Sequence, residues 1–179
     1  MNPATIWTIG HSTRSLEDFI GLLRSEHVEL LADVRRYPAS RMHPQFNAEA
    51  LRQFLTAARV RYEGHPELGG RRAPCPDSTN TRWRNASFRG YADYMETPAF
   101  NAALARLMAD ATESRTAIMC AEAPWWRCHR ALIADALKAR GVEVLHIMGE
   151  GRLILHPYTS AASVVDGKLC YGMPRDLFA

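Results

Sequence analysis

Short apolar runs alternate along this chain with longer segments in which apolar residues recur every three or four positions. The runs of strand length lie at 5–9, 29–34, 60–62, 117–120 and 143–147, and the segments of helical period lie at 15–26, 47–58, 90–95, 97–108 and 131–140. A chain that alternates in this way folds through right-handed crossovers into a mainly parallel sheet covered by helices. We therefore predict a three-layer α/β fold with about five strands and helices on both faces. A partial or distorted barrel would use the same alternation.

Two segments depart from this alternation. Segment 71–89 contains two prolines, a polar run and five arginines interleaved with Trp83 and Phe88. We predict a long basic loop there, because structureless connections of this length are uncommon without a role. Residues 157–179 are rich in small residues and form a C-terminal tail for which the pattern predicts no regular structure.

Composition adds limits to this picture. A chain of 179 residues that is 47% hydrophobic is expected to form one domain over 1–179. Lys138 and Lys168 are the only lysines among 22 basic residues, and arginine suits bidentate contacts with phosphate. No apolar run approaches the roughly 18 residues of a membrane span. With four irregularly spaced cysteines and no evident leader, the expected location is the cytoplasm. The sequence contains no signal for oligomeric state.

Reactive residues collect in the stretch 116–130. Its first part reads as a buried strand that ends at Cys120 and Glu122, Pro124 interrupts it, and a helical pattern follows. We expect Cys128 and His129 in the first turn of that helix, where unpaired N–H groups and the helix dipole favour anions and thiolates. The carboxyl ends of parallel strands share one edge of a sheet, so the polar residues and glycines that follow the other strands are expected near this stretch. These are His11, Ser12, Asp33, Arg35, Gly69, Gly70 and His146.

The order and spacing of these motifs resemble one known family. The matching motifs are Gly10-His-Ser12, Asp33-Val-Arg35 with Pro38 and Ser40-Arg41, Phe46, Leu68-Gly-Gly70, Tyr91-Ala-Asp-Tyr-Met95, Met119-Cys-Ala-Glu122, Cys128-His-Arg130 and His146-Ile147. Together they resemble the bacterial and archaeal family called domain of unknown function 488, from about residue 6 to 150. The resemblance implies a cytoplasmic single-domain α/β protein with these motif positions as its site. It implies no reaction.

Three interpretations of the cysteines and histidine remain open. Cys120, Cys128 and His129 are residue types that bind zinc or iron, although Cys-x7-Cys-His lacks the Cys-x2-Cys spacing of structural zinc sites. Alternatively, Cys128 is a nucleophile whose pKa is lowered by His129 and the neighbouring arginines. Cys120 could also simply fill the core, since free cysteine is among the most buried residue types.

The carboxylates and the anion-binding groups also have alternative roles. Asp33 and Glu122 could act as general acid and base, because neighbouring carboxylates push their pKa values apart. Asp33 could equally form an ion pair that holds loops in place. Ser12 could offer donors to an anion or could cap a helix. The other expected substrate-binding residues are His11, Arg35, Ser40, Arg41, Gly69, Gly70, Tyr91 and Arg130.

These patterns favour an enzyme, a hydrolase or a group transferase, that acts on a phosphorylated, nucleotide-like or nucleic-acid substrate. Arginines interleaved with aromatic rings are typical of sites for phosphates and unstacked bases, although a solvated basic surface has the same composition. No Walker or dinucleotide fingerprint occurs, and the only cofactor suggested is zinc or iron. The alternatives are a non-catalytic nucleotide or nucleic-acid binding module and a protein with a structural metal clip.

Overall fold

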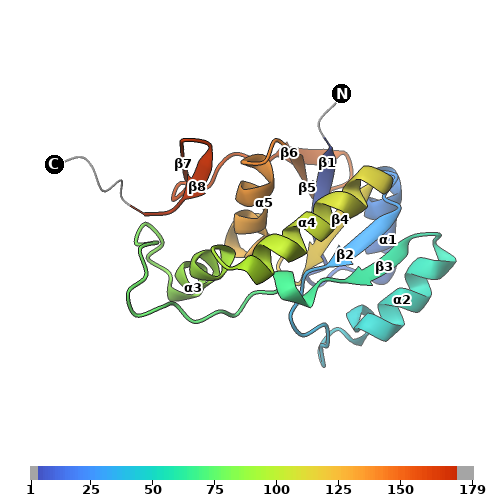
Figure 1. The fold of residues 1–179 in the computed structure, drawn as a ribbon. Helices are drawn as coiled ribbons and strands as arrows, with labels where there is room; N and C mark the ends of the chain where they lie inside the picture. Colours follow the sequence, from blue (N-terminus) through green and yellow to red (C-terminus); the bar gives the residue numbers. More distant parts are fainter. Residues whose placement is uncertain (1–3, 173–179) are drawn as a thin grey trace, which may run out of the picture.

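The computed structural model describes residues 4–172, which form a six-stranded sheet surrounded by five α-helices (Figure 1). The sheet order is β3-β2-β4-β1-β5-β6, and all neighbours are parallel except the β5–β6 pair. The strands are β1 Thr5–Gly10, β2 Leu30–Asp33, β3 Arg61–Gly64, β4 Thr116–Cys120, β5 Glu143–Gly149 and β6 Arg152–Leu155. Because β3 and β6 are separate edges, this sheet is open, and the α/β prediction is confirmed while the barrel alternative is excluded for the described residues.

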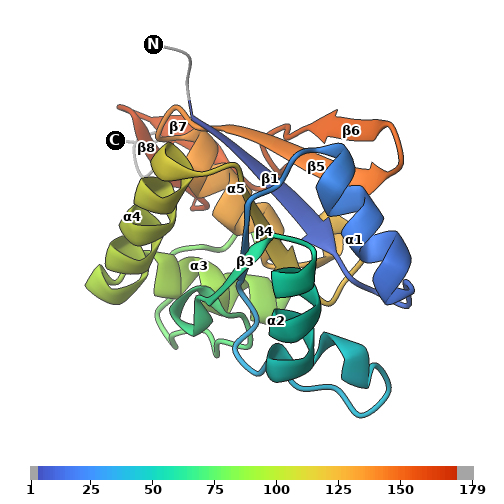
Figure 2. The same cartoon turned by 90° about the vertical axis from the view of Figure 1, so that its right-hand side faces the viewer.

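The helices cover both faces of the sheet, as Figure 2 shows from the side. They are α1 Leu16–Ser25, α2 Ala48–Ala57, α3 Ala86–Met95, α4 Pro98–Glu113 and α5 Arg130–Lys138. The central strands β1, β2 and β4 are buried on both faces, so each has residues facing two separate cores. In β1, Ile6 faces the core under α3, α4 and α5, whereas Trp7 and Ile9 face the core under α1 and α2. The three layers position the carboxyl ends of the central strands at one edge.

Helix α3 begins four residues earlier than the hydrophobic pattern indicates. Asn85 caps the helix, because its side-chain oxygen accepts hydrogen bonds from the N–H groups of Ser87 and Phe88 at 2.9 and 3.2 Å. The last residues of the segment predicted as a loop, 86–89, are therefore helical.

The region after β5 contains strands that the pattern did not indicate. Strand β6 is the sixth strand, and the described part of the tail forms a hairpin of β7 Ser163–Val165 and β8 Lys168–Cys170. The tail is anchored by Tyr171, which donates a 2.9 Å hydrogen bond to Asp135. No helix in the described part of the chain is long and apolar enough to cross a membrane.

Acid is expected to destabilise this fold through a buried histidine. The ring nitrogens of His146 form hydrogen bonds with Thr8 and His156. Burial lowers the pKa of His146 from 6.5 to about 2, and the nearby His156 and Arg130 lower it further. The unfolded chain therefore binds a proton below pH 6.5 that the folded chain does not. Stability is complete above pH 6.5 and falls below it, by about 2 kcal/mol between pH 7 and pH 5 from this group.

Urea unfolding at pH 7 and pH 5 measures this loss. His146→Gln is expected to reduce the difference between the two pH values, and His27→Gln, which changes an exposed histidine, is expected to leave it unchanged. Equal pH dependence in both variants would assign the acid sensitivity to other groups.

Candidate functional site

A cavity of about 660 Å³ opens where β1, β2 and β4 end. Strands β1 and β4 end in register, with Gly10 beside Cys120, and the N–H groups of His11 and Ser12 continue the ladder to the carbonyls of Cys120 and Ala121. The cavity is lined by the loops that follow these strands, by Gly70 and Arg71, by the start of α3, and by the segment that leads into α5. The parallel sheet therefore brings separate polar loops into one pocket.

Two glycines allow these loops to approach one another. A Cβ at Gly10 would lie 1.9 Å from the carbonyl oxygen of Glu122, and a Cβ at Gly69 would lie 2.6 Å from the Cβ of Arg36. Any larger residue would push the loops apart. Ser12 has a φ of 47°, a left-handed conformation that is uncommon outside glycine and recurs at functional sites.

Three donor atoms converge at the floor of the cavity. The Nδ1 atom of His129 lies 3.6 Å from the Sγ atom of Cys128 and 3.9 Å from that of Cys120. All three donor atoms lie within 4.8 Å of one another, and all three residues line the cavity. The thiols are nearly buried, since Cys120 is 8% exposed and Cys128 3%.

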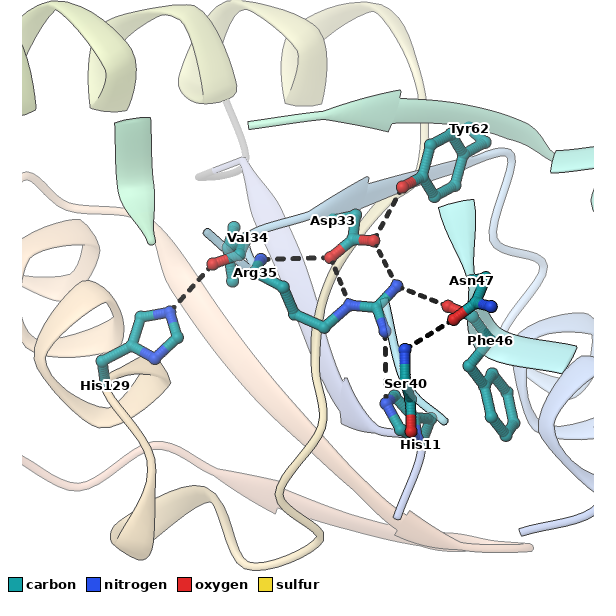
Figure 3. A network of polar contacts seen from close by, with 9 residues as sticks. All are labelled: His11, Asp33, Val34, Arg35, Ser40, Phe46, Asn47, Tyr62 and His129. Atoms are coloured by element: carbon teal, nitrogen blue, oxygen red, sulfur yellow. Dashed lines mark hydrogen bonds and ion pairs between the residues drawn. The ribbon is translucent and has the colours of Figure 1, made fainter. Parts of the chain in front are cut away.

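The orientation of His129 is fixed by the backbone. Its Nε2 atom lies 3.0 Å from the carbonyl oxygen of Val34, which can only accept, so Nε2 carries the proton (Figure 3). In the neutral ring, Nδ1 is then a free lone pair that faces the two sulfurs. A Cβ at Gly70 would lie 3.0 Å from this Nδ1, so glycine leaves space beside it.

The interaction between the two neighbouring thiols separates their pKa values. The proximity of Cys128, followed by burial, raises the pKa of Cys120 well above its ordinary value. Burial opposes ionisation of Cys128 as well, but the proximity of Cys120, His129 and Arg130 outweighs it, and the pKa of Cys128 is lowered well below its ordinary value. The pair therefore favours a state with one thiolate.

A buried ion pair supports the loop that carries Val34. The Nε and Nη2 atoms of Arg35 donate to the carboxylate of Asp33 at 2.8 and 2.6 Å, and Arg35 N–H and Tyr62 O–H donate to the same carboxylate. Arg35 also donates to the carbonyl of Phe46 at 2.7 Å (Figure 3). Asp33 is thus saturated with hydrogen bonds. Val34, which lies between Asp33 and Arg35 in the chain, accepts the hydrogen bond from His129.

His11 also lines the cavity. The Nδ1 atom of His11 donates a 2.9 Å hydrogen bond to the carbonyl oxygen of Ser12. The ring of His11 stacks on the ring of Phe46, with 4.3 Å between the ring centroids. Burial lowers the pKa of His11 from 6.5 to about 4, despite the hydrogen bond to Ser12, with Arg35 and His43 lowering it further. His11 is therefore uncharged at neutral pH.

The cavity wall is strongly basic. Glu122 is the only carboxylate among the described residues that line it, whereas four arginines do so. Beside His11 and His43, the lining contributes Arg35, Arg36, Arg71 and Arg127. Because one of these, Arg35, is neutralised by Asp33, the remaining three arginines give the pocket a net preference for anions.

The structure brings most of the expected site residues together. The cavity is lined by His11, Ser12, Arg35, Ser40, Gly70, Tyr91, Cys120, Glu122, Cys128 and His129. Four others do not line it, namely Asp33, Arg41, Gly69 and Arg130. Arg130 is buried and donates to the carbonyls of Glu122 and Ala123 and to Thr8. His146 also lies away from the cavity, against Trp125.

The helical turn expected around the reactive residues begins later than the sequence indicates. Trp125–Arg127 form a short 3₁₀ helix, Cys128 is extended with a φ of −127°, and His129 is the N-cap residue of α5. Cys128 is extended, whereas His129 has helical backbone angles (φ −57°, ψ −14°), and this change of conformation between neighbouring residues lets both side chains face the same point. The sequence indicated Arg127 only as a neighbour of Cys128, and Arg36 and Arg71 only as members of basic loops, because the folded loops are what bring the three to one cavity.

Comparison with known proteins identifies one family. The family model described as Domain of unknown function DUF488 matches residues 15–137. Searches of curated proteins and of solved structures found no match.

Proposed function

The chain belongs to the DUF488 family, and we propose that it is a metal-dependent enzyme, a hydrolase or group transferase, that acts on a phosphorylated, nucleotide-like substrate. Cys120, Cys128 and His129 would hold the metal ion, and zinc suits this set of two thiolates and one imidazole. The three residues line the cavity, so a fourth coordination position would face the substrate. Three protein ligands with an open position are typical of catalytic zinc sites.

The spacing of the donor atoms carries this proposal. In a tetrahedral site with zinc–sulfur bonds of about 2.3 Å and zinc–nitrogen bonds of about 2.05 Å, sulfur and nitrogen ligands lie about 3.6 Å apart. The two measured Nδ1–Sγ distances are 3.6 and 3.9 Å. The hydrogen bond from His129 to Val34 adds the support that metal-bound histidines usually have, because it fixes the tautomer and the ring.

The basic wall would bind the phosphoryl group. Arg36, Arg71 and Arg127 line the cavity, and within residues 4–172 none of the three forms a carboxylate ion pair like that of Arg35 with Asp33. Tyr37 is 61% exposed on the same wall, with the guanidinium carbon of Arg36 5.5 Å from its ring centre. An exposed ring beside a cation suits the flat base of a nucleotide.

Glu122 would transfer protons, and the Asp33–Arg35 pair would be a positioning element. Glu122 is exposed to the cavity and is its one lining carboxylate among the described residues. A metal ion at the thiol–imidazole cluster supplies Lewis-acid activation of water and of a phosphoryl oxygen. Asp33 does not line the cavity and is saturated by four hydrogen bonds, so its role is to hold the Val34 carbonyl toward His129.

Glu122→Gln is expected to lower kcat by about 10²- to 10⁴-fold without loss of metal, since it removes a proton-transfer group and no ligand. The assay follows hydrolysis of a chromogenic aryl phosphate, as monoester and as diester, by the zinc-loaded protein, with metal content measured in parallel. Glu150→Gln, at an exposed turn outside the cavity, is the matched control and should retain full activity.

A non-catalytic binding module predicts the opposite pattern. In that case, nucleotide binding would depend on Arg36 and Arg71, and no zinc-dependent hydrolysis of either ester would be detected. Equal activity of Glu122→Gln and the unaltered protein would exclude Glu122 as the proton-transfer group.

A further inference from the structure

A second cluster of metal-ligand types lies outside the strand-end cavity. Glu63 belongs to β3, His65 directly follows it, and Asp110 lies on α4. Their ligand atoms all lie within 4.8 Å of one another, and none of the three lines the cavity. Residues 63 and 65 are two positions apart in extended chain, so their side chains share the face that α4 covers.

His65 has buried polar atoms without partners. Its side chain is fully buried, and within residues 4–172 neither ring nitrogen has a hydrogen-bond partner. The Oδ2 atom of Asp110 is likewise buried without a hydrogen bond, although it lies only 3.4 Å from Nε2 of His65. Buried polar groups are normally satisfied, and the 3.4 Å contact gives these two facing atoms no hydrogen bond, so a shared partner between them would satisfy both.

The separation of these atoms fits a metal ion between them. Nitrogen and oxygen ligands about 2.05 Å from a tetrahedral ion lie about 3.3 Å apart. The measured distance is 3.4 Å. Two carboxylates would balance the charge of a divalent cation, and imidazole selects zinc and its transition-metal neighbours over magnesium and calcium.

We propose that Glu63, His65 and Asp110 bind a divalent transition-metal ion of the zinc class, independently of the thiol–imidazole cluster. The ion joins the edge strand β3 to α4 beside the hydrogen bond that Arg106 of α4 donates to the Gly64 carbonyl at 2.9 Å. It thereby fixes the start of the segment that leads through Leu68 to Gly70 at the cavity. Its role is structural, since no member of the cluster reaches the substrate pocket.

Zinc content of the full chain tests this proposal. The protein is dialysed against zinc and then against buffer, and its zinc is counted by elemental analysis. The unaltered chain should retain about two zinc ions and Asp110→Asn about one. Glu113→Gln, an exposed acid at the end of the same helix, should retain about two. Glu63→Gln provides a second variant should Asp110→Asn fold poorly.

The Cys128→Ser chain separates this site from the thiol–imidazole cluster. Zinc should raise the melting temperature of Cys128→Ser by several degrees and should have no such effect on Cys128→Ser with Asp110→Asn. If Asp110→Asn lost zinc while Cys128→Ser kept all of its zinc, the result would support the Glu63–His65–Asp110 site and contradict the proposed function, which needs zinc at the cysteines. Zinc retained equally by Asp110→Asn, Glu63→Gln and the unaltered chain would overturn the present proposal.

Discussion

His129→Ala should lose the metal ion of the thiol–imidazole cluster and should lower turnover of the aryl phosphate by about 10³-fold. The substitution removes the Nδ1 lone pair that faces both sulfurs and the hydrogen bond to Val34. Lewis-acid stabilisation contributes several kcal/mol, and about 1.4 kcal/mol corresponds to a tenfold change in rate. Elemental analysis and initial rates measured on the same preparation test both effects.

His43→Ala is the matched control, because His43 lines the same cavity but does not belong to the cluster. It should retain the metal. The two cysteines distinguish a metal ligand from a nucleophile. Ligands act as a set, so Cys120→Ser and Cys128→Ser should both lose the metal ion of the thiol–imidazole cluster, and with it the activity, but keep the ion of the second cluster. If only Cys128→Ser were inactive while the metal content of every variant stayed the same, Cys128 would be a nucleophile.

Asp33→Asn is expected to destabilise the protein by about 3–5 kcal/mol, because it leaves the Arg35 guanidinium buried without its counter-charge. Both side chains of the pair are nearly inaccessible, at 1% and 7% exposure. The same variant should weaken zinc binding by about 10- to 100-fold, as is usual when support for a metal ligand is removed. Urea unfolding and competition with a zinc-binding dye measure the two quantities.

Tyr62→Phe serves as the control for this network. It removes one 2.7 Å hydrogen bond to Asp33 but keeps the ion pair, so its cost should be about 1.5–3 kcal/mol with little change in zinc affinity. Zinc affinity that stayed unchanged in Asp33→Asn would show that the Asp33–Arg35 pair does not position His129.

The candidate cluster could be anticipated from the sequence because its members end a strand and begin the next helix. The hydrophobic period located β4 and α5, and parallel strands bring their carboxyl ends together, so Cys120, Cys128 and His129 were expected at one edge. The partner that fixes the ring of His129 could not be anticipated, because Val34 contributes a backbone carbonyl, which any residue carries.

Burial and contacts between distant parts of the chain account for the other differences between the sequence predictions and the structure. Asp33 and Glu122 look alike in the sequence, and only the structure shows that the first is saturated by Arg35 and Tyr62 while the second faces the cavity. Strand β6 has four exposed residues, so it lacks the alternation of a half-buried strand and is defined by its pairing with β5. The contact between His65 and Asp110 joins residues far apart in the sequence, which no local pattern encodes.

X-ray absorption at the zinc edge tests the central claim most directly, because it identifies the ligand atoms around the ion. The sample is zinc-loaded Asp110→Asn, in which the second cluster no longer contributes. We expect two sulfur atoms at about 2.3 Å and lighter ligands at about 2.0–2.1 Å, and we expect the zinc–sulfur signal to be lost when Cys120→Ser is added to this variant. A first shell without sulfur, or a protein that retains no metal ion, would contradict the assignment of Cys120, Cys128 and His129 as the metal centre.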